Sequence, residues 1–216
     1  MTLSDLVQLV WDKLGDQSLF YGREEIVRSG INPAQRLLCL VYPLLSMQRV
    51  TVTVIQEQAF IDLRTLMDSA NVRVGHRVHR VSRVVLGNVT TDTPSRTVTG
   101  GELHELRLTT VGALSRRANN WMTQRGLMTH YWLWGAYWLG LYKRVVTETV
   151  LTVIFHAMPA PMENDADTPD IDAVYHSVIA EVATGLLLVK EGQGEGERGV
   201  ARVVKALNLQ PQGAVA

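Results

Sequence analysis

The sequence predicts an α+β fold: a helical bundle from N- and C-terminal helices, with an inserted antiparallel β-domain between them. Near both ends of the chain, apolar residues recur every three or four positions, which is the period of an amphipathic helix. The middle of the chain is instead rich in β-branched residues and alternates with a period of two, as half-buried strands do. This order of helices, strands and helices gathers the helices on one side of the sheet.

The clearest element is a long helix over residues 170–191. Its apolar residues form one broad stripe: Ile171, Val174, Tyr175, Val178, Ile179, Val182, Leu186 and Leu187. Asp170 or Asp172 can cap the start, and Gly192 follows Lys190 at a usual stop position. Gly185 interrupts the helix at an expected cost of about 1 kcal/mol relative to alanine.

Two further helices are predicted near the N-terminus. The first covers residues 3–14, has one apolar face and is followed by Gly15 as a stop. Asn32 and Pro33 supply an N-cap and a first-turn proline for the second, which is apolar on most sides and therefore predicted to be buried. Pro43 is expected to kink or end it.

Strands are predicted through the middle of the chain. VTVTVI at 50–55 is β-branched throughout, and AFIDL from residue 59 resembles a short partner strand. Residues 72–78 alternate strictly, which predicts a half-buried antiparallel strand. Two aromatic strands are predicted around a turn near Gly135, and TVLTVIF at 149–155 is a further β-branched strand.

These elements predict three regions. Residues 1–46 hold the N-terminal helices of the bundle, and residues 47–156 form the inserted antiparallel β-domain. A loop near 87–101 is expected to be mobile or functional, because structureless loops of this length are uncommon. Residues 157–216 contain an acidic linker, the long helix, a last short helix and a flexible tail.

Charge is balanced overall but uneven along the chain. The formal net charge is zero, which argues against general nucleic-acid affinity. Residues 64–125 hold ten arginines against four acidic residues, whereas residues 157–197 hold nine acidic residues against Lys190 alone. Such asymmetry is typical of a solvated surface; the alternative is charge-complementary contact between copies or partners.

No motif of a catalytic, cofactor or metal site occurs. The glycine-rich phosphate-binding and GxSxG patterns are missing, and the histidines lack ligand spacing. Cys39 lies in an apolar run that predicts a buried, inert thiol. The apolar run 127–142 is too short for a membrane span. We therefore expect no enzyme, cofactor, metal or membrane contact, and synthesis in a cytoplasm.

Arginines near Trp121 are the best candidates for binding a partner. Arg116, Arg117 and Arg125 flank this residue and suit a phosphate or an acidic surface, although a solvated face is the default for such a group. The tryptophans within 132–138 could stack on bases or sugars. They lack interleaved basic residues, however, and are predicted to be core.

An ordered series of features runs through the second half of the chain. Trp121 and Gly126 precede the aromatic run, which is followed by TVLTVIF, AMPAPM, the acidic DTPDID, Tyr175-His176 and a helix ending LLLVKEG. The series resembles the head-to-tail connector (adaptor) proteins of tailed bacteriophages. The N-terminal half, with its helix, INPAQRLLCL and strands, also fits this family. The Trp-rich aromatic segment, Gly185 and the GQGEG link depart from its pattern.

The resemblance implies a structural virion protein in the neck between capsid and tail, made in the host cytoplasm. Copies would form a ring, commonly of twelve, that joins the portal protein to a downstream neck or tail protein. The ring would extend the channel for genomic DNA without sequence-specific contact. The residues expected at partner interfaces are Arg73, Arg77, Arg116, Arg117, Arg125, Gly192, Val200, Val203, Val204 and Leu207.

Other functions remain open at this point. Within the same class, the chain could be another neck or tail-completion protein, such as a stopper or tail terminator. From a different class, a nucleic-acid-binding accessory protein could use Arg73, Arg77, Arg116 and Arg117. That protein would bind DNA as an isolated monomer with steep salt dependence. An enzyme would need a pocket that holds two titratable groups.

Overall fold

The protein is described here from a computed structural model. The described residues are 1–15, 20–67, 71–74, 77–87, 104–135, 137–192, 194 and 196–201. The chain separates into two compact units. We call Met1–Ser46 with Met158–Ala216 the helical unit, and Met47–Ala157 the β-unit.

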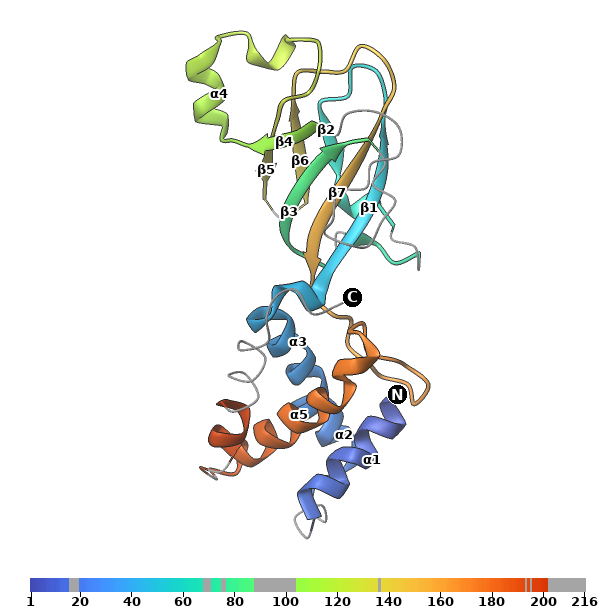
Figure 1. Ribbon diagram of the computed structural model, residues 1–216. Coiled ribbons are helices and arrows are strands. Elements are labelled where there is room, and N and C mark those ends of the chain that lie inside the picture. Colours follow the sequence, from blue (N-terminus) through green and yellow to red (C-terminus); the bar gives the residue numbers. More distant parts are fainter. Residues whose placement is uncertain are drawn as a thin grey trace. The chain divides into compact units, whose positions relative to one another are not determined.

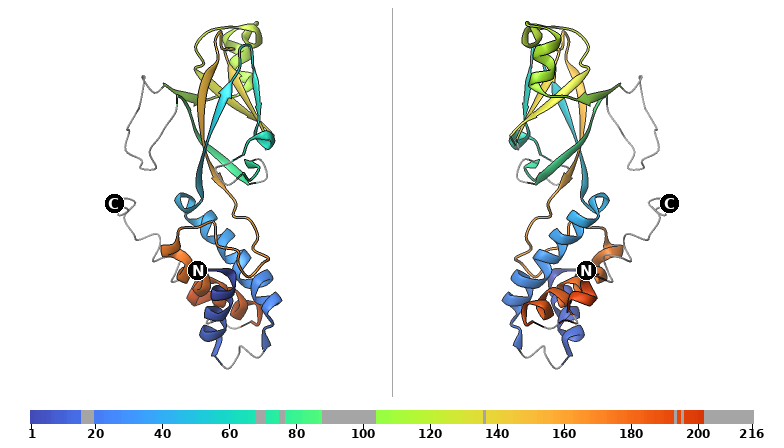
Figure 2. Two further views of the ribbon diagram at one scale, coloured as in Figure 1. Left: turned by 90° about the vertical axis from the view of Figure 1, so that its right-hand side faces the viewer. Right: turned by 90° about the vertical axis from the view of Figure 1, so that its left-hand side faces the viewer.

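The helical unit is built from both ends of the chain around one apolar core. Its elements are α1 (Leu3–Leu14), α2 (Arg23–Glu25), the π-helix η2 (Ile26–Ile31), α3 (Asn32–Val41), the 3₁₀ turns η3 (Pro43–Ser46) and η7 (Ala173–Tyr175), and α5 (His176–Lys190). α5 packs against α1, η2 and α3 (Figure 2). The side chains of Leu6, Ile26, Leu38, Ile179 and Leu187 are buried in the shared core.

The two N-terminal helices begin and end near the predicted residues. Thr2 and Asp5 form a capping box at α1, and Gly15 follows the helix with φ +58°. α3 continues directly from η2, has Pro33 in its first turn and stops at Val41, before Pro43. Asn32 is itself helical and is not the predicted N-cap, because its side chain exchanges hydrogen bonds with the Met162 backbone. The capping box satisfies backbone amides that the start of α1 leaves unpaired, and Pro43 lacks the amide that would extend α3.

The long C-terminal helix starts later than predicted. Asp172 caps the 3₁₀ turn η7 by accepting a hydrogen bond from the Val174 amide at 3.1 Å, and α5 begins only at His176. Together η7 and α5 are long and apolar enough to cross a membrane by length and composition, but the inner face of α5 is buried in the helical unit. This stretch therefore serves as the central core helix of the unit.

Gly185 has a packing role in α5. A Cβ built at this position would lie 2.7 Å from Val200 Cγ2 and 3.2 Å from the Gly196 carbonyl oxygen. Gly196 is equally restricted, since its Cβ would lie 2.6 Å from the Val189 amide nitrogen. The two glycines therefore allow the segment 196–201 to pack directly on α5.

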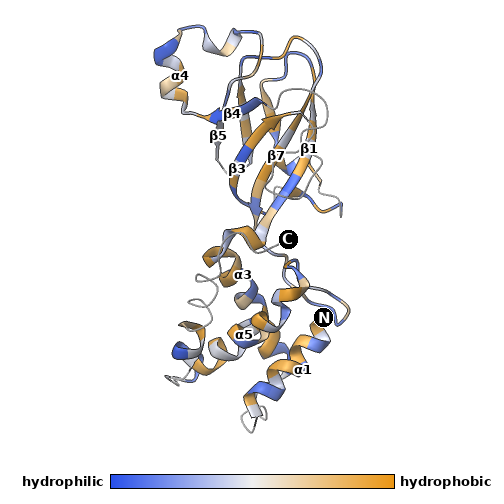
Figure 3. Cartoon of the chain, in the orientation of Figure 1, coloured by the Kyte–Doolittle hydropathy of each residue, from blue (hydrophilic) through white to orange (hydrophobic). Residues whose placement is uncertain are grey.

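The β-unit is a seven-stranded sheet with the order β1-β7-β3-β4-β5-β6-β2 (Figure 1). Its strands are β1 (Met47–Val54), β2 (Phe60–Asp62), β3 (Val78–Leu86), β4 (His104–Leu108), β5 (His130–Trp134), β6 (Trp138–Tyr142) and β7 (Thr149–Ala157). Met47 opposes His156, so the unit starts and ends on neighbouring strands. Two register shifts between β3 and β7 increase local twist, which favours a curved sheet. Hydrophobic residues run along both strands (Figure 3).

The predicted fold class is wrong. The chain has a mixed α/β fold whose seven-stranded sheet is nearly closed and barrel-like, with few helices; it is not a helical bundle with an inserted antiparallel β-domain. The prediction paired all strands antiparallel, but β4 and β5 are parallel. A parallel pair needs a long connection, and here it passes through α4 (Val111–Arg117) and η6 (Trp121–Thr123). The alternation of residues along a strand indicates which face is buried, but it does not indicate which other strand lies beside it.

One strand prediction also needs correction, and three are confirmed. At the described positions 72–74 and 77 the predicted strand is not found: Arg73 makes an isolated bridge with Met67, and β3 starts at Val78. The two aromatic strands around Gly135 are confirmed as β5 and β6, and the strand at 149–155 is confirmed as β7. Apart from Gly87, the predicted loop at 87–101 lies outside the described residues.

Candidate partner interface

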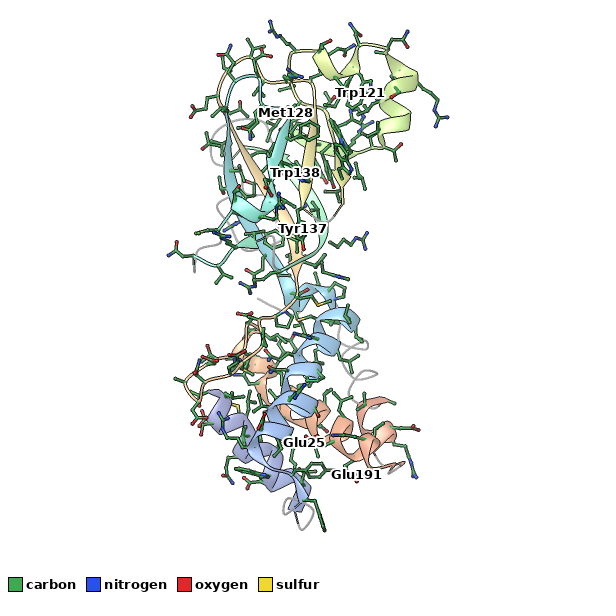
Figure 4. All side chains as sticks on the ribbon, turned by 180° about the vertical axis from the view of Figure 1, so that it is seen from behind. Glu25, Trp121, Met128, Tyr137, Trp138 and Glu191 are labelled. Carbon is green, nitrogen blue, oxygen red and sulfur yellow. The ribbon has the colours of Figure 1, made fainter. Side chains whose placement is uncertain are left out.

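A small aromatic core fixes α4 to the sheet. Thr110 caps α4 by accepting a hydrogen bond from the Ala113 amide at 3.2 Å, and Leu114 is buried beneath the helix. The rings of Trp121 and Trp132 meet edge to face, with centroids 5.0 Å apart. Both side chains are buried in this small core. We call residues 110–125 the α4 lobe. Trp121 lies at the end of the β-unit that carries this lobe (Figure 4).

Gly140 makes room for Trp132 between β5 and β6. The two residues are direct cross-strand partners. A Cβ at Gly140 would lie 2.6 Å from Trp132 Nε1 and closer still to the ring carbon Cε2. The indole therefore lies over the glycine, and the position of the α4 lobe depends on the absence of a side chain at Gly140.

Four basic side chains gather where the α4 lobe meets β4, β5 and β6. The Nη1 atom of Arg117 lies 3.2 Å from Nε2 of His130. Arg107 is the register partner of His130 across the parallel β4–β5 pair. Lys143 directly follows Tyr142, the partner of His130 on the other side. We call Arg107, Arg117, His130 and Lys143 the His130 cluster.

The electrostatics of the cluster favour a neutral imidazole. Burial lowers the pKa of His130, and the positive charges of Arg117, Arg107 and Lys143 lower it further. The neutral ring can then accept a hydrogen bond from the Arg117 guanidinium at Nε2. Among the described residues, no carboxylate forms an ion pair with Arg107, Arg117 or Lys143. The cluster is thus a concentrated positive charge.

Exposed apolar side chains lie near these cations in the sequence. Leu108, next to Arg107 in β4, is 62% exposed, and Leu127, which precedes β5, is 61% exposed. Val111 and Met122 of the α4 lobe are also exposed. A surface that combines basic and apolar groups is suited to a protein partner, which can bury both kinds of group.

The predicted interface arginines do not form one surface. Arg117 belongs to the His130 cluster, whereas Arg125 pairs with Glu57 at 2.8 Å. Arg116 donates to the carbonyl of Gly112 in its own helix at 3.2 Å. Arg73 is exposed, whereas Arg77 is buried.

The C-terminal interface residues can be placed only in part. Gly192 follows α5 with φ +73° and donates from its amide to the Val189 carbonyl at 2.9 Å, as a helix stop should. Val200 lies against Gly185. The other three predicted residues, Val203, Val204 and Leu207, lie outside the described residues.

Much of the acidic linker in the helical unit is used within the unit. Asp165 forms an ion pair with Arg23. Asp167 accepts hydrogen bonds at 2.8 Å from the amides of Glu163 and Asn164, which lower the pKa of its carboxyl. Asp170 accepts from the Ala160 amide at 2.9 Å. The linker thus holds its own turns, while Glu163 and, on α5, Glu181 are exposed.

The two units carry opposite charge. Met47–Ala157 contains 13 arginine and lysine residues against 7 acidic ones, a formal net charge of +6. Met1–Ser46 with Met158–Ala216 contains 8 against 14, a formal net charge of −6. The net charge of zero is therefore the sum of two opposite charges, and each of them belongs to one structural unit.

The aromatic hairpin divides into buried and exposed parts. Trp132 is buried as predicted, but Trp134 is 68% exposed and Trp138 is also exposed, so the prediction that all three are core is wrong. The Arg64 guanidinium lies 5.4 Å from the ring centroid of Trp138 and 5.7 Å from that of Tyr137. Trp138 and Tyr137 lie away from Trp121, toward the other end of the β-unit (Figure 4).

Among the described residues, the remaining concave and reactive features do not make a catalytic constellation. A hollow of about 470 Å³ in the helical unit is lined by Arg23, Arg28 and Arg36, with Met162 and Glu163 opposite. Within the described ranges, no three His, Cys, Asp or Glu side chains are grouped to hold a metal ion. Burial raises the pKa of Cys39 to about 11, which keeps the thiol protonated and unreactive.

The comparisons with known proteins match the geometry of an interaction protein. The family model described as SU10 adaptor protein matches residues 1–201, which is most of the chain. No curated protein matches the sequence.

Proposed function

The chain belongs to the SU10 adaptor protein family, a phage head-to-tail adaptor family, and we propose that copies of it form the ring that joins the portal to the tail. Membership makes the chain a phage structural adaptor protein of the virion neck that interacts with other neck proteins. The proposal adds a ring, a portal contact and a downstream tail contact. The ring encloses a channel for the genome, and the protein is made in the host cytoplasm.

The observation that carries the proposal is the opposite charge of the two units. A chain with formal charges of +6 and −6 on separate units can place the β-unit of one copy against the helical unit of the next. Such a contact is heterologous, because different surfaces of identical chains meet, and heterologous contacts that close give rings. At 0.1 M salt the interaction between exposed charges is largely screened beyond a distance of about 10 Å. Assembly through this contact is therefore predicted to weaken as salt is added.

The function proposed here is mechanical and does not include catalysis. The His130 cluster presents an imidazole among cations but no nucleophile paired with a base and no carboxylate pair. An adaptor needs surfaces that neighbours recognise and a shape that holds them in register. Buried cores in both units supply the rigid support for those surfaces.

Joining heads to tails in vitro tests the proposed function. Particles assembled without this chain are predicted to yield filled heads and free tails, and the purified full-length chain is predicted to restore joining when added to them. Joining at an undiminished level in its absence would refute the adaptor role. If the chain restores joining from a position outside the neck, the ring and portal contact are wrong.

A nucleic-acid-binding accessory role is the second candidate. The observation in its favour is the His130 cluster, whose cations have no acidic partner among the described residues. Anisotropy measurements with a short DNA duplex test it. Binding by the free chain that falls steeply with salt would support this role over that of a ring protein.

A further inference from the structure

We propose that the His130 cluster is the contact point between copies, where it binds a carboxylate-bearing surface of the helical unit of a second copy. This inference rests on the proposed assembly of copies into a ring, and it names the surface that each copy uses. The cluster brings cations from three places in the chain to one point: Arg107 from β4, Arg117 from α4 and Lys143 from the end of β6.

The first argument is that the cluster needs an anion. Arg107, Arg117 and Lys143 repel one another, and no carboxylate of the described residues neutralises them. Nearby acidic groups are used elsewhere: Glu105 binds Arg83 at 2.7 Å, and Glu57 binds Arg125. An external carboxylate would remove the repulsion and gain charge-assisted hydrogen bonds.

Backbone geometry at Lys143 gives a second argument. Lys143 has φ +67°, a left-handed conformation that is unfavourable for a residue with a side chain. The backbone next to Lys143 is held in place because the Arg144 amide donates a hydrogen bond to the Gln124 carbonyl at 2.9 Å. The α4 lobe thereby holds Lys143 beside Tyr142 and His130 in spite of this unfavourable conformation.

The exposed apolar residues indicate a protein rather than a nucleic acid. Leu127 is 61% exposed and follows Gly126, where a Cβ would lie 3.8 Å from Lys143 Cδ, and Leu108, which follows Arg107 in β4, is 62% exposed. A DNA backbone would leave these side chains in water, because phosphates and sugars offer little apolar surface. A protein surface can bury them while its carboxylates meet the cations.

The charge of the chain itself indicates a second copy as the partner. The helical unit contains 14 acidic residues against 8 basic ones. Some acidic groups, such as Asp165 and Asp167, are committed to their own unit, but Glu163 and Glu181 are exposed. Each copy therefore carries both the cationic cluster and the anionic surface that the cluster of another copy requires.

Zero-length cross-linking tests the contact directly. Lys143 is the only lysine of the β-unit, so a carbodiimide that joins an amine to a touching carboxylate reports on one position there. The experiment uses the full chain at low salt, as an equal mixture of isotope-labelled and unlabelled protein. The predicted product joins Lys143 of one isotope to a carboxylate of the helical unit of the other.

Matched variants separate this cluster from general charge effects. The double variant R107Q/R117Q is predicted to reduce the mixed-isotope product about tenfold, since close charge pairs across interfaces couple by more than about 1.5 kcal/mol. The control R64Q/R80Q removes the same formal charge from exposed positions of the same unit and is predicted to leave the product nearly unchanged. The single variant R107Q, which retains the Arg117–His130 contact, guards against misfolding and is predicted to give an intermediate loss.

Four results would overturn the inference. Lys143 could join only carboxylates of its own chain, or mixed products could be missing at every protein concentration. The control could lose as much product as R107Q/R117Q. Finally, DNA binding that R107Q/R117Q abolishes, without mixed products, would assign the cluster to nucleic acid. In each case the head–tail joining experiment still decides the adaptor role separately.

Discussion

Replacing Gly140 by alanine tests how the interface is held in place. An alanine Cβ would lie 2.6 Å from Trp132 Nε1, so the indole must move. Overfilling a packed site costs about 1–3 kcal/mol. Displacing Trp132 also weakens its edge-to-face contact with Trp121, a kind of contact worth about 0.5–1.5 kcal/mol. We expect G140A to lower the free energy of unfolding by about 2–4 kcal/mol.

A second glycine supplies the control for this experiment. A Cβ at Gly112 in α4 would meet no atom within 4 Å, so G112A should stabilise the chain by about 0.5–1 kcal/mol through backbone entropy. The assay is urea unfolding followed by tryptophan fluorescence, with near-ultraviolet circular dichroism for the environment of Trp121 and Trp132. G140A is further predicted to reduce cross-linking at Lys143. If G140A were as stabilising as G112A, the account of how Trp132 positions the α4 lobe would be refuted.

Three further predictions concern other parts of the chain. Gln35 is 1% exposed and neither atom of its amide has a hydrogen-bond partner among the described residues, so Q35M should raise the free energy of unfolding by about 1 kcal/mol in urea titrations; a loss would show that the amide is satisfied. The pKa of His130 is lower in the folded chain than in the unfolded chain, so on acidification the unfolded chain binds a proton at His130 first. The stability that the neutral His130 ring contributes is therefore complete above about pH 6.5 and is lost as the pH falls below that value. Comparing H130Q with the parent chain by thermal unfolding across this range should show less pH dependence in the variant, and equal slopes would contradict the assignment. Deleting residues 202–216, which keeps the packing of 196–201 on α5, should spare the fold, judged by circular dichroism, but abolish portal docking in a binding assay; equal docking by the shortened chain would exclude these residues from the portal contact.

Helix positions could be predicted because their signals are local. Gly15 ends α1, in agreement with the sequence, whereas the predicted cap at Asn32 is wrong, because the helix runs on from η2 and the Asn32 side chain bonds the Met162 backbone instead. α5 began late because Asp172 caps a 3₁₀ turn instead of the helix itself, a choice that adjacent carboxylates leave open. Gly185 has no local explanation, since the atoms that require it belong to Gly196 and Val200.

The sheet could be predicted only at the level of single strands. β5, β6 and β7 have clear aromatic or β-branched signatures. The parallel pairing of β4 with β5 could not be derived, because it depends on the connection through α4 and on side-chain packing around Trp121. This pairing is the reason the predicted antiparallel domain was wrong.

The interface was only partly accessible from sequence. Arg117 was identified by its proximity to Trp121, but Arg107, His130 and Lys143 were missed. They are distant in sequence and meet only through the β4–β5–β6 register. An unneutralised lysine directly after an aromatic strand was the sole available signal. The charge asymmetry was visible, whereas its coincidence with two structural units required the fold.

The most direct test of the central claim is a reconstruction of the assembled neck of the phage particle. The account predicts copies of this chain arranged around the axis, with the His130 cluster of each copy against an acidic surface of the helical unit of its neighbour. The account would be contradicted by a neck in which neighbouring copies meet through surfaces of like charge, or in which the cluster faces the channel and its DNA.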